Sequence, residues 1–247
     1  MKKFTYLVIA TAALGMVACT GGNKAGYVVT GTVEGASDGD TVYLQEATGR
    51  NLTKLDTAVI TKGTFTFEGT QDSVVSRYVT CEVNGEPLMI DFFLENGNIT
   101  VALGEENKIG GTANNDTYQQ FKDNFIAMSK EMNDMYRSAM SDSTLTDEQR
   151  ENVMKEIEKK DSIAMDMVFN TIEANITNAV GIQLLPSYAA AFELDKQKSL
   201  VEKIPAQFAN NDRIVKLKKH IETVEKTAVG QKYIDFSMDT PEGQTVK

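Results

Sequence analysis

The chain has 247 residues, of which 41% are hydrophobic and 24% charged, and its formal net charge is −10. An acidic chain has no electrostatic reason to bind nucleic acid or anionic lipid headgroups, which excludes those partners. Its two cysteines, Cys19 and Cys81, stand far apart. A CxxC pair and a multi-cysteine metal site are therefore excluded as well.

Residues 1–18 have the anatomy of an export signal. A short basic region precedes the apolar stretch 4–17, which is shorter than the roughly 20 residues that a membrane-spanning helix needs. The small residue Ala18 directly precedes Cys19. This arrangement resembles the lipobox of bacterial lipoproteins, and the resemblance implies that Cys19 is lipidated. The alternative is an ordinary signal peptide followed by an incidental cysteine.

Removal of the signal takes two lysines from a chain of net charge −10, so residues 19–247 carry −12. Attachment to a membrane must then come from the lipid on Cys19 rather than from a basic patch. Residues 19–26 are rich in glycine and read as a flexible tether. Because the tether lacks an acidic cluster resembling a surface-export tag, we expect an outer-membrane anchor that faces the periplasm.

Residues 27–110 predict an antiparallel β domain. Alternating apolar and polar residues indicate about seven short strands, and turn residues separate them at roughly ten-residue spacing, which is typical of a sandwich or barrel. Lys62-Gly63 is interpreted as the turn of a hairpin, and residues 37–40 as a second turn. The expected strands are 27–33, 41–45, 57–61, 64–68, 77–83, 88–94 and 99–103.

Residues 111–228 predict a helical module. Thr146 and Gln149 form a capping box that begins a second helix, so the first two helices read as an antiparallel hairpin. Further helices are expected near 181–193, 196–203 and 212–227, with Asp195 and Asn211 or Asp212 as caps. The apolar stripes of the hairpin consist of Phe121, Phe125, Met128, Met132, Met135 and Ala139, and of Val153, Ile157, Ala164 and Val168.

Methionines are frequent in the two long helices. At helical spacing we interpret them as core residues, and an adaptable Met-rich binding groove is the alternative. The residues concerned are Met128, Met132, Met135, Met140, Met154, Met165 and Met167.

Few other side chains suggest chemistry. Cys81 alternates with valines, which favours a buried, unreactive thiol over a redox role. His220, the only histidine, lies among charged residues of an expected helix surface, so a triad or metal site around it is not indicated. Asp38 and Asp40 suit a turn better than a calcium loop, because the downstream ligands are missing. We therefore predict no catalytic, cofactor-binding or metal-binding residues.

Two segments resemble a known family. The pattern of residues 31–69, with Gly111, Asn114 and Tyr118 after it, resembles the β domain of unknown function at the N-terminus of many Bacteroidota thioredoxin-like lipoproteins. Residues 229–247 are similar to the opening of TlpA/ResA-like and AhpC/TSA-type thioredoxin domains, although position 234 is Ile where that family often has Pro. The family's Trp-Cys-x-x-Cys segment would lie beyond residue 247, so none of its redox residues can be carried over.

Together these features predict an α+β fold, in which an antiparallel sandwich or barrel precedes a helical hairpin and further helices. A vestigial or truncated thioredoxin-domain strand would occupy 229–247. The expected function is that of a membrane-anchored, non-catalytic periplasmic lipoprotein, which binds or positions a periplasmic protein partner in thiol–disulfide redox. The alternatives are the N-terminal portion of a TlpA/ResA-like thiol–disulfide oxidoreductase, and a small-ligand carrier that uses the interior of the β domain.

Overall fold

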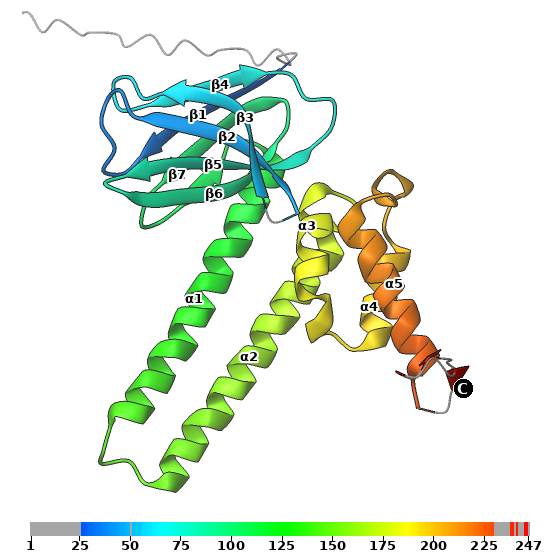
Figure 1. Ribbon diagram of the computed structural model, residues 1–247. Coiled ribbons are helices and arrows are strands. Elements are labelled where there is room, and N and C mark those ends of the chain that lie inside the picture. The colour runs from blue at the N-terminus through cyan, green and yellow to red at the C-terminus, as the bar shows by residue number, and fades with distance from the viewer. Residues whose placement is uncertain (1–25, 50, 230–237, 240, 242–244, 247) are drawn as a thin grey trace, which may run out of the picture.

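A computed structural model describes residues 26–49, 51–229, 238–239, 241 and 245–246 (Figure 1). The expected lipidation site, Cys19, and most of the thioredoxin-like segment 229–247 lie outside these residues. The described part is an α+β fold in which eight N-terminal strands precede five α-helices. The predicted fold class is therefore confirmed.

The strands form two four-stranded sheets that face each other as an open sandwich, not a closed barrel. All neighbouring strands run antiparallel except β1 and β7, which are parallel. One sheet has the order β4 (Phe65–Gly69), β1 (Tyr27–Val33), β7 (Gly97–Leu103) and β8 (Lys108–Gly110). The other has the order β3 (Asn51–Val59), β2 (Thr41–Thr48), β5 (Val75–Val83) and β6 (Glu86–Leu94).

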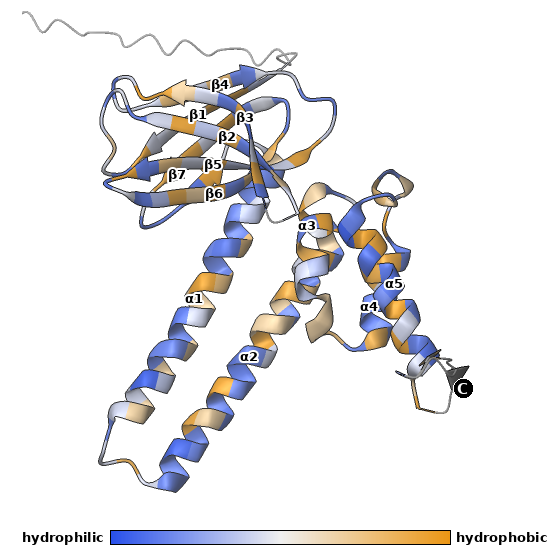
Figure 2. Cartoon of the chain, in the orientation of Figure 1, coloured by the Kyte–Doolittle hydropathy of each residue, from blue (hydrophilic) through white to orange (hydrophobic). Residues whose placement is uncertain are grey.

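The alternation of the sequence places one side of each inner strand between the sheets. In β4, for example, Phe65 and Phe67 are buried and the residues that follow each of them are exposed. Figure 2 shows this alternation of hydrophobic and hydrophilic residues along the strands. Apolar side chains fill the space between the sheets, among them Val29, Val42, Leu44, Val79, Phe92, Ile99 and Val101.

The predicted hairpin around Lys62-Gly63 is confirmed only at its turn, where Thr61 and Thr64 form a single antiparallel bridge, and its strand pairing is wrong beyond that bridge. Both turn residues have positive φ, 54° and 75°, and the Asp38 carboxylate accepts hydrogen bonds from both backbone N–H groups, at 2.9 and 2.8 Å. The flanking strands then part, because β3 pairs with β2 in one sheet and β4 pairs with β1 in the other. The turn thus connects the two sheets.

Two further strands differ from the prediction. β3 begins at Asn51 rather than at residue 57. The sequence did not predict this earlier start, because the N-terminal half of the strand is exposed on both sides and carries no apolar alternation. β8 spans only Lys108–Gly110 and was not predicted, because three residues are too few to establish an alternating pattern.

The first two helices form the expected hairpin, which extends away from the sandwich (Figure 1). They are α1 (Ala113–Ser141) and α2 (Asp147–Asn175). The predicted capping box at the start of α2 is present, since the Thr146 hydroxyl accepts from the Gln149 N–H at 3.2 Å and the Gln149 side chain accepts from the Thr146 N–H at 2.8 Å.

Three shorter helices follow and pack beside the half of the hairpin that is nearest the sandwich (Figure 1). They are α3 (Ala179–Tyr188), α4 (Leu194–Glu202) and α5 (Asp212–Thr227), with short 3₁₀ turns at Ala189–Ala191 and Ala206–Phe208. Asn211 caps α5 as predicted, but Asp195 does not cap α4. That helix begins two residues earlier, so Glu193 is the N-cap and Asp195 lies in the first turn.

A second hydrophobic core lies between these helices, the N-terminal part of α1 and the C-terminal part of α2. Its members include Phe93, Phe121, Val168, Ile172, Leu185, Leu200 and Ile214. The core interpretation of the hairpin methionines holds only in part. Met165 and Met167 are half-buried and pack against this core, whereas Met140 is 45% exposed. The other four are half-buried but belong to neither core: Met128, Met132, Met135 and Met154. Phe93 belongs to this helical core although it lies on β6, so the sandwich and the helical module share packing at that strand.

Within the described residues, no helix is both long and apolar enough to cross a membrane. Past α5, β9 (Met238–Asp239) pairs antiparallel with β10 (Thr245–Val246).

Candidate binding groove between the sandwich and helix α1

The start of α1 is held against β6 by one buried side chain. Asn115 is fully buried, and its amide oxygen accepts from the Phe93 N–H at 2.8 Å. Its amide nitrogen donates to the Phe93 carbonyl and to the Thr112 hydroxyl, both at 2.8 Å. β6 is an edge strand, so the Asn115 amide occupies the place that the backbone of a further strand would take.

One helical turn further, a polar cluster connects the same two elements. The Tyr118 hydroxyl donates to one carboxylate oxygen of Asp91 on β6 at 2.6 Å. The ammonium group of Lys122 lies 3.5 Å from the other carboxylate oxygen and 4.5 Å from the centre of the Tyr118 ring. Tyr118 and Lys122 stand four residues apart on α1, so both face β6.

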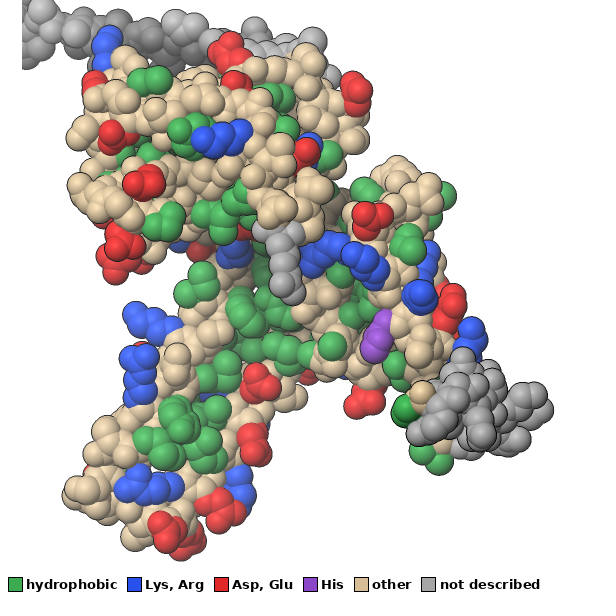
Figure 3. Space-filling model, in the orientation of Figure 1, with side chains coloured by type: hydrophobic (Ala, Val, Ile, Leu, Met, Phe, Trp, Pro, Cys, Tyr) green, Lys and Arg blue, Asp and Glu red, His purple; other side chains and the backbone are tan. Residues whose placement is uncertain are grey.

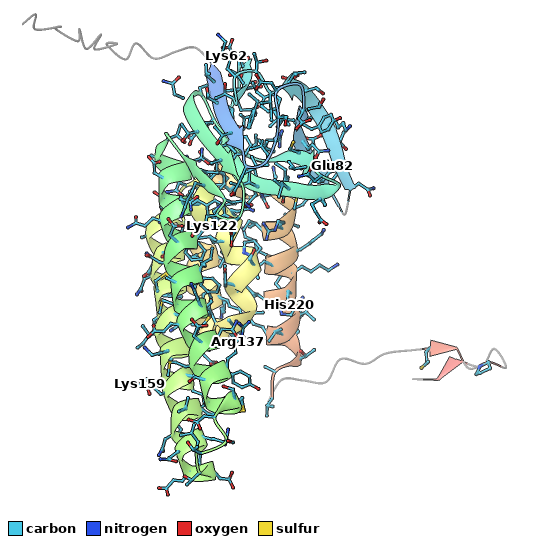
Figure 4. All side chains as sticks on the ribbon, turned by 90° about the vertical axis from the view of Figure 1, so that its left-hand side faces the viewer. Lys62, Glu82, Lys122, Arg137, Lys159 and His220 are labelled. Atoms are coloured by element: carbon cyan, nitrogen blue, oxygen red, sulfur yellow. The ribbon has the colours of Figure 1, made fainter. Side chains whose placement is uncertain are left out.

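Burial alters the acid–base properties of this cluster. The pKa of Lys122 is lowered because removal from water, which disfavours the ammonium form, outweighs the attraction of Asp91. The pKa of Tyr118 is raised by burial first, and then by the neighbouring carboxylate charge of Asp91. Lys122 is thus a cation with only 20% of its side chain exposed and one long ionic contact. Figure 4 shows it just below the sandwich.

Beside this cluster lies a groove of about 490 Å³, which we call the β6 groove. Its walls are residues 89–91 of β6, residues 105–108 up to the start of β8, and one face of α1. Two apolar side chains stand open at its mouth, since Met89 is 51% and Ile126 62% exposed. An exposed pair of this kind at the edge of a concave surface is typical of a binding site.

The rim of the β6 groove is acidic. Four carboxylates and two ammonium groups line it, and Lys108 is already paired with Asp123 at 2.8 Å. Glu105 and Glu106 are exposed, and no salt bridge of the described residues involves either of them. The groove therefore offers an entering ligand two carboxylates that make no salt bridge among the described residues.

A smaller aromatic cleft of about 240 Å³ continues the surface on the other side of Lys122, between α1 and α3. Phe121 and Phe125 stack with ring centres 5.9 Å apart, and Tyr188 meets Phe125 edge-on at 5.6 Å. Figure 3 shows hydrophobic side chains gathered between these helices, below the sandwich. Lys122 and Ile126 line both the groove and the cleft, which makes them one continuous surface.

The residues that the sequence singled out lie elsewhere. Cys81 is buried in the sandwich core, and burial raises the pKa of its thiol, which keeps it in the unreactive form. His220 is exposed on α5. The Asp38 carboxylate is engaged in the turn at Lys62-Gly63, whose N–H groups lower its pKa. In the described ranges, no three His, Cys, Asp or Glu side chains are grouped as metal ligands would be.

The groove itself was missed by the sequence interpretation. The one signal that could have indicated it is the pair Tyr118 and Lys122, which places a phenol and an ammonium group four residues apart on one side of a helix. Their partner Asp91 lies 27 residues before Tyr118 on a strand, and no periodic pattern links the two.

Fold and groove together define an α+β protein in which a β-sandwich is joined to a helical module across a candidate binding surface. Residues 27–118 match the family described as a domain of unknown function (DUF4369). The match covers the whole sandwich and ends in α1 at Tyr118, so it includes the contacts of Asn115 and Tyr118 with β6. Searches of curated proteins and of solved structures found no match.

Proposed function

We propose that this protein is a lipid-anchored, non-catalytic module of the bacterial envelope that binds and positions a periplasmic protein partner in thiol–disulfide redox. Cys19 would hold it at the outer membrane, facing the periplasm. The observation that supports partner binding is the β6 groove, where exposed Met89 and Ile126 stand beside the mostly buried ammonium of Lys122. Apolar anchors around a desolvated polar group are the usual centre of a protein interface.

The anchor is tested by metabolic labelling of the source cells with a palmitate analogue. The wild-type protein should carry the label and sediment with the outer membrane, because several acyl chains give stable attachment. The Cys19→Ser variant should carry no label and appear in the soluble fraction. A labelled Cys19→Ser protein, or an unlabelled wild type, would contradict the anchor.

Partner binding is tested by photo-crosslinking in intact cells. A photoreactive residue replaces Ile126 in the groove. In a matched variant it replaces Leu52, which is 41% exposed on β3, and β3 is the edge strand opposite β6 in their common sheet. We expect one protein adduct at position 126 whose partner carries a redox CxxC pair, and none at position 52. Equal adducts at both positions, or none at 126, would refute the proposal.

A second candidate function is the N-terminal portion of a TlpA/ResA-like thiol–disulfide oxidoreductase. The antiparallel pairing of β9 with β10 is the observation that favours it, because it places strand structure in the segment that resembles the start of a thioredoxin domain. The source gene should then continue in frame past residue 247 into a CxxC segment, and the longer product should reduce insulin disulfides. A stop codon directly after residue 247 would contradict this function.

A further inference from the structure

The free edge of β6 carries backbone groups with no strand beside them. Neighbouring residues of an antiparallel strand point their N–H and C=O groups to alternate sides. Both backbone groups of Phe93 point away from β5, since they bond to the side chain of Asn115. Those of Asp91 and Met89, two and four residues earlier, therefore point the same way.

These groups are only partly satisfied. The Met89 carbonyl accepts from the Asn107 side chain at 3.1 Å, and the Asp91 carbonyl accepts from the Lys122 ammonium at 3.5 Å, a long contact. Among the hydrogen bonds of the described residues, none uses the N–H of Met89 or of Asp91. Both residues line the β6 groove.

We infer that the β6 groove accepts an extended, basic peptide segment of the partner, which pairs with the backbone of Met89 and Asp91 as an added strand. This inference rests on the proposed function and specifies how the partner binds. Strand addition satisfies the two free N–H groups, and alternate side chains of the segment then point to opposite sides. The two free-edge residues of β6 lie about 6.6 Å apart, so a segment of roughly four residues spans the pairing site.

The charge of the rim defines the side chains of this segment. Lysine or arginine at alternate positions would meet Glu105 and Glu106, which have no salt-bridge partner among the described residues. The positions between would place apolar side chains against Ile126 and Ala127 on α1. An alternating basic and apolar sequence therefore fits both walls of the groove.

A second copy of this chain fits the groove less well. The exposed edge of β6 lies between α1 and residues 105–108, two walls that a whole sandwich approaching this edge would have to pass. Residues 19–247 also carry −12, so two copies repel each other, whereas a basic segment is attracted. The occupant is therefore a peptide segment rather than a β6–β6 dimer.

The test compares two substitutions of one residue. Met89→Pro removes an N–H that points into the groove and not toward β5, and Pro87 already occupies the same edge two residues earlier. Met89→Thr keeps the N–H and the extended conformation. A phage library of random heptapeptides is selected on wild-type protein, and the binding of the selected peptides is measured by fluorescence anisotropy.

We expect selected peptides that alternate basic and apolar residues, bind Met89→Pro at least tenfold more weakly than wild type, and bind Met89→Thr within twofold of it. Hydrogen exchange on the wild type gives a readout without any variant. The amides of Met89 and Asp91 should exchange quickly in the free protein and become protected by the peptide.

Each other outcome contradicts part of the scheme. Peptides that bind Met89→Pro as tightly as wild type, without protecting the two amides, would leave the groove as a binding site but overturn strand addition. Failure to select any saturable peptide would also overturn it. Crosslinking at position 126 in cells would then still support the proposed function, because the partner would bind the groove with a folded surface instead of an extended segment.

Discussion

Asn115 is the buried side chain that holds the start of α1 against β6, and its contribution can be tested by its removal. The Asn115→Ala substitution deletes the amide that bonds to Phe93 and Thr112 while it keeps a good helix former in the first turn of α1. No other hydrogen bond of the described residues reaches the N–H or the carbonyl of Phe93 on this side of β6. Both groups would remain buried without a partner.

The expected loss follows from those two groups. A buried polar group without a partner destabilises a protein by about 1–3 kcal/mol, and the cavity left by the amide adds to this. We therefore expect Asn115→Ala to lower the free energy of unfolding by about 4 kcal/mol. The matched Asn124→Ala substitution on the exposed side of α1 should change it by about 0.5 kcal/mol or less.

Urea unfolding of residues 20–247, followed by circular dichroism, measures both values. Native-state hydrogen exchange of the α1 amides adds the local effect, since Asn115→Ala should release the first turns of α1 before the sandwich unfolds. A loss below about 1 kcal/mol for Asn115→Ala, or equal losses for the two variants, would refute this account of how α1 is held.

Two further changes test other contacts. Gly181→Ala should lower the free energy of unfolding by about 2 kcal/mol in urea, because a Cβ there would overlap the backbone of Asn175 and Ile176 at the end of α2; an unchanged value would contradict that packing. The pKa of the Tyr118 phenol is raised in the folded protein, so as the pH rises the unfolded chain loses the phenol proton first. The contribution of this phenol to the free energy of unfolding is therefore complete below a pH of about 10 and declines above it. Tyr118→Phe should lower the free energy of unfolding by about 2 kcal/mol at pH 7. Between pH 10 and 11 the free energy of unfolding should fall less steeply in the variant than in wild type, and equal slopes would contradict this role of Tyr118.

Local patterns predicted the elements well where one side of an element is buried. The alternation in β1 and the capping residues of α2 and α5 lie in the segments that form those elements, so the information is local. The pairing of β3 and β4 was not local, because a tight turn fixes only the direction of the chain and not the sheet that each strand joins.

The groove could not be predicted for the same reason. Asn115 reads as an ordinary polar residue at a helix start, and only the nearness of β6 turns its amide into a substitute for a strand. Lys122 likewise reads as a surface charge until the sandwich covers it. Long-range contacts between a strand and a helix determine both roles, and hydrophobic periodicity carries no information about them.

The open edge of β3 is the natural rival of β6 for strand addition, and its structure argues against it. β3 is nine residues long and almost wholly exposed, but it carries an irregularity at Leu55. Leu44 and Gln45 of β2 pair with Asp56 and Lys54, which leaves Leu55 without a partner and twists the ribbon away from a regular ladder. Lys54 in its middle lies over the Tyr43 ring at 3.6 Å and places a charge on the edge, a common protection against added strands. β6, by contrast, combines N–H groups that are free among the described residues with the flanking walls of the β6 groove, so a peptide that docked on β3 would not respond to Met89→Pro.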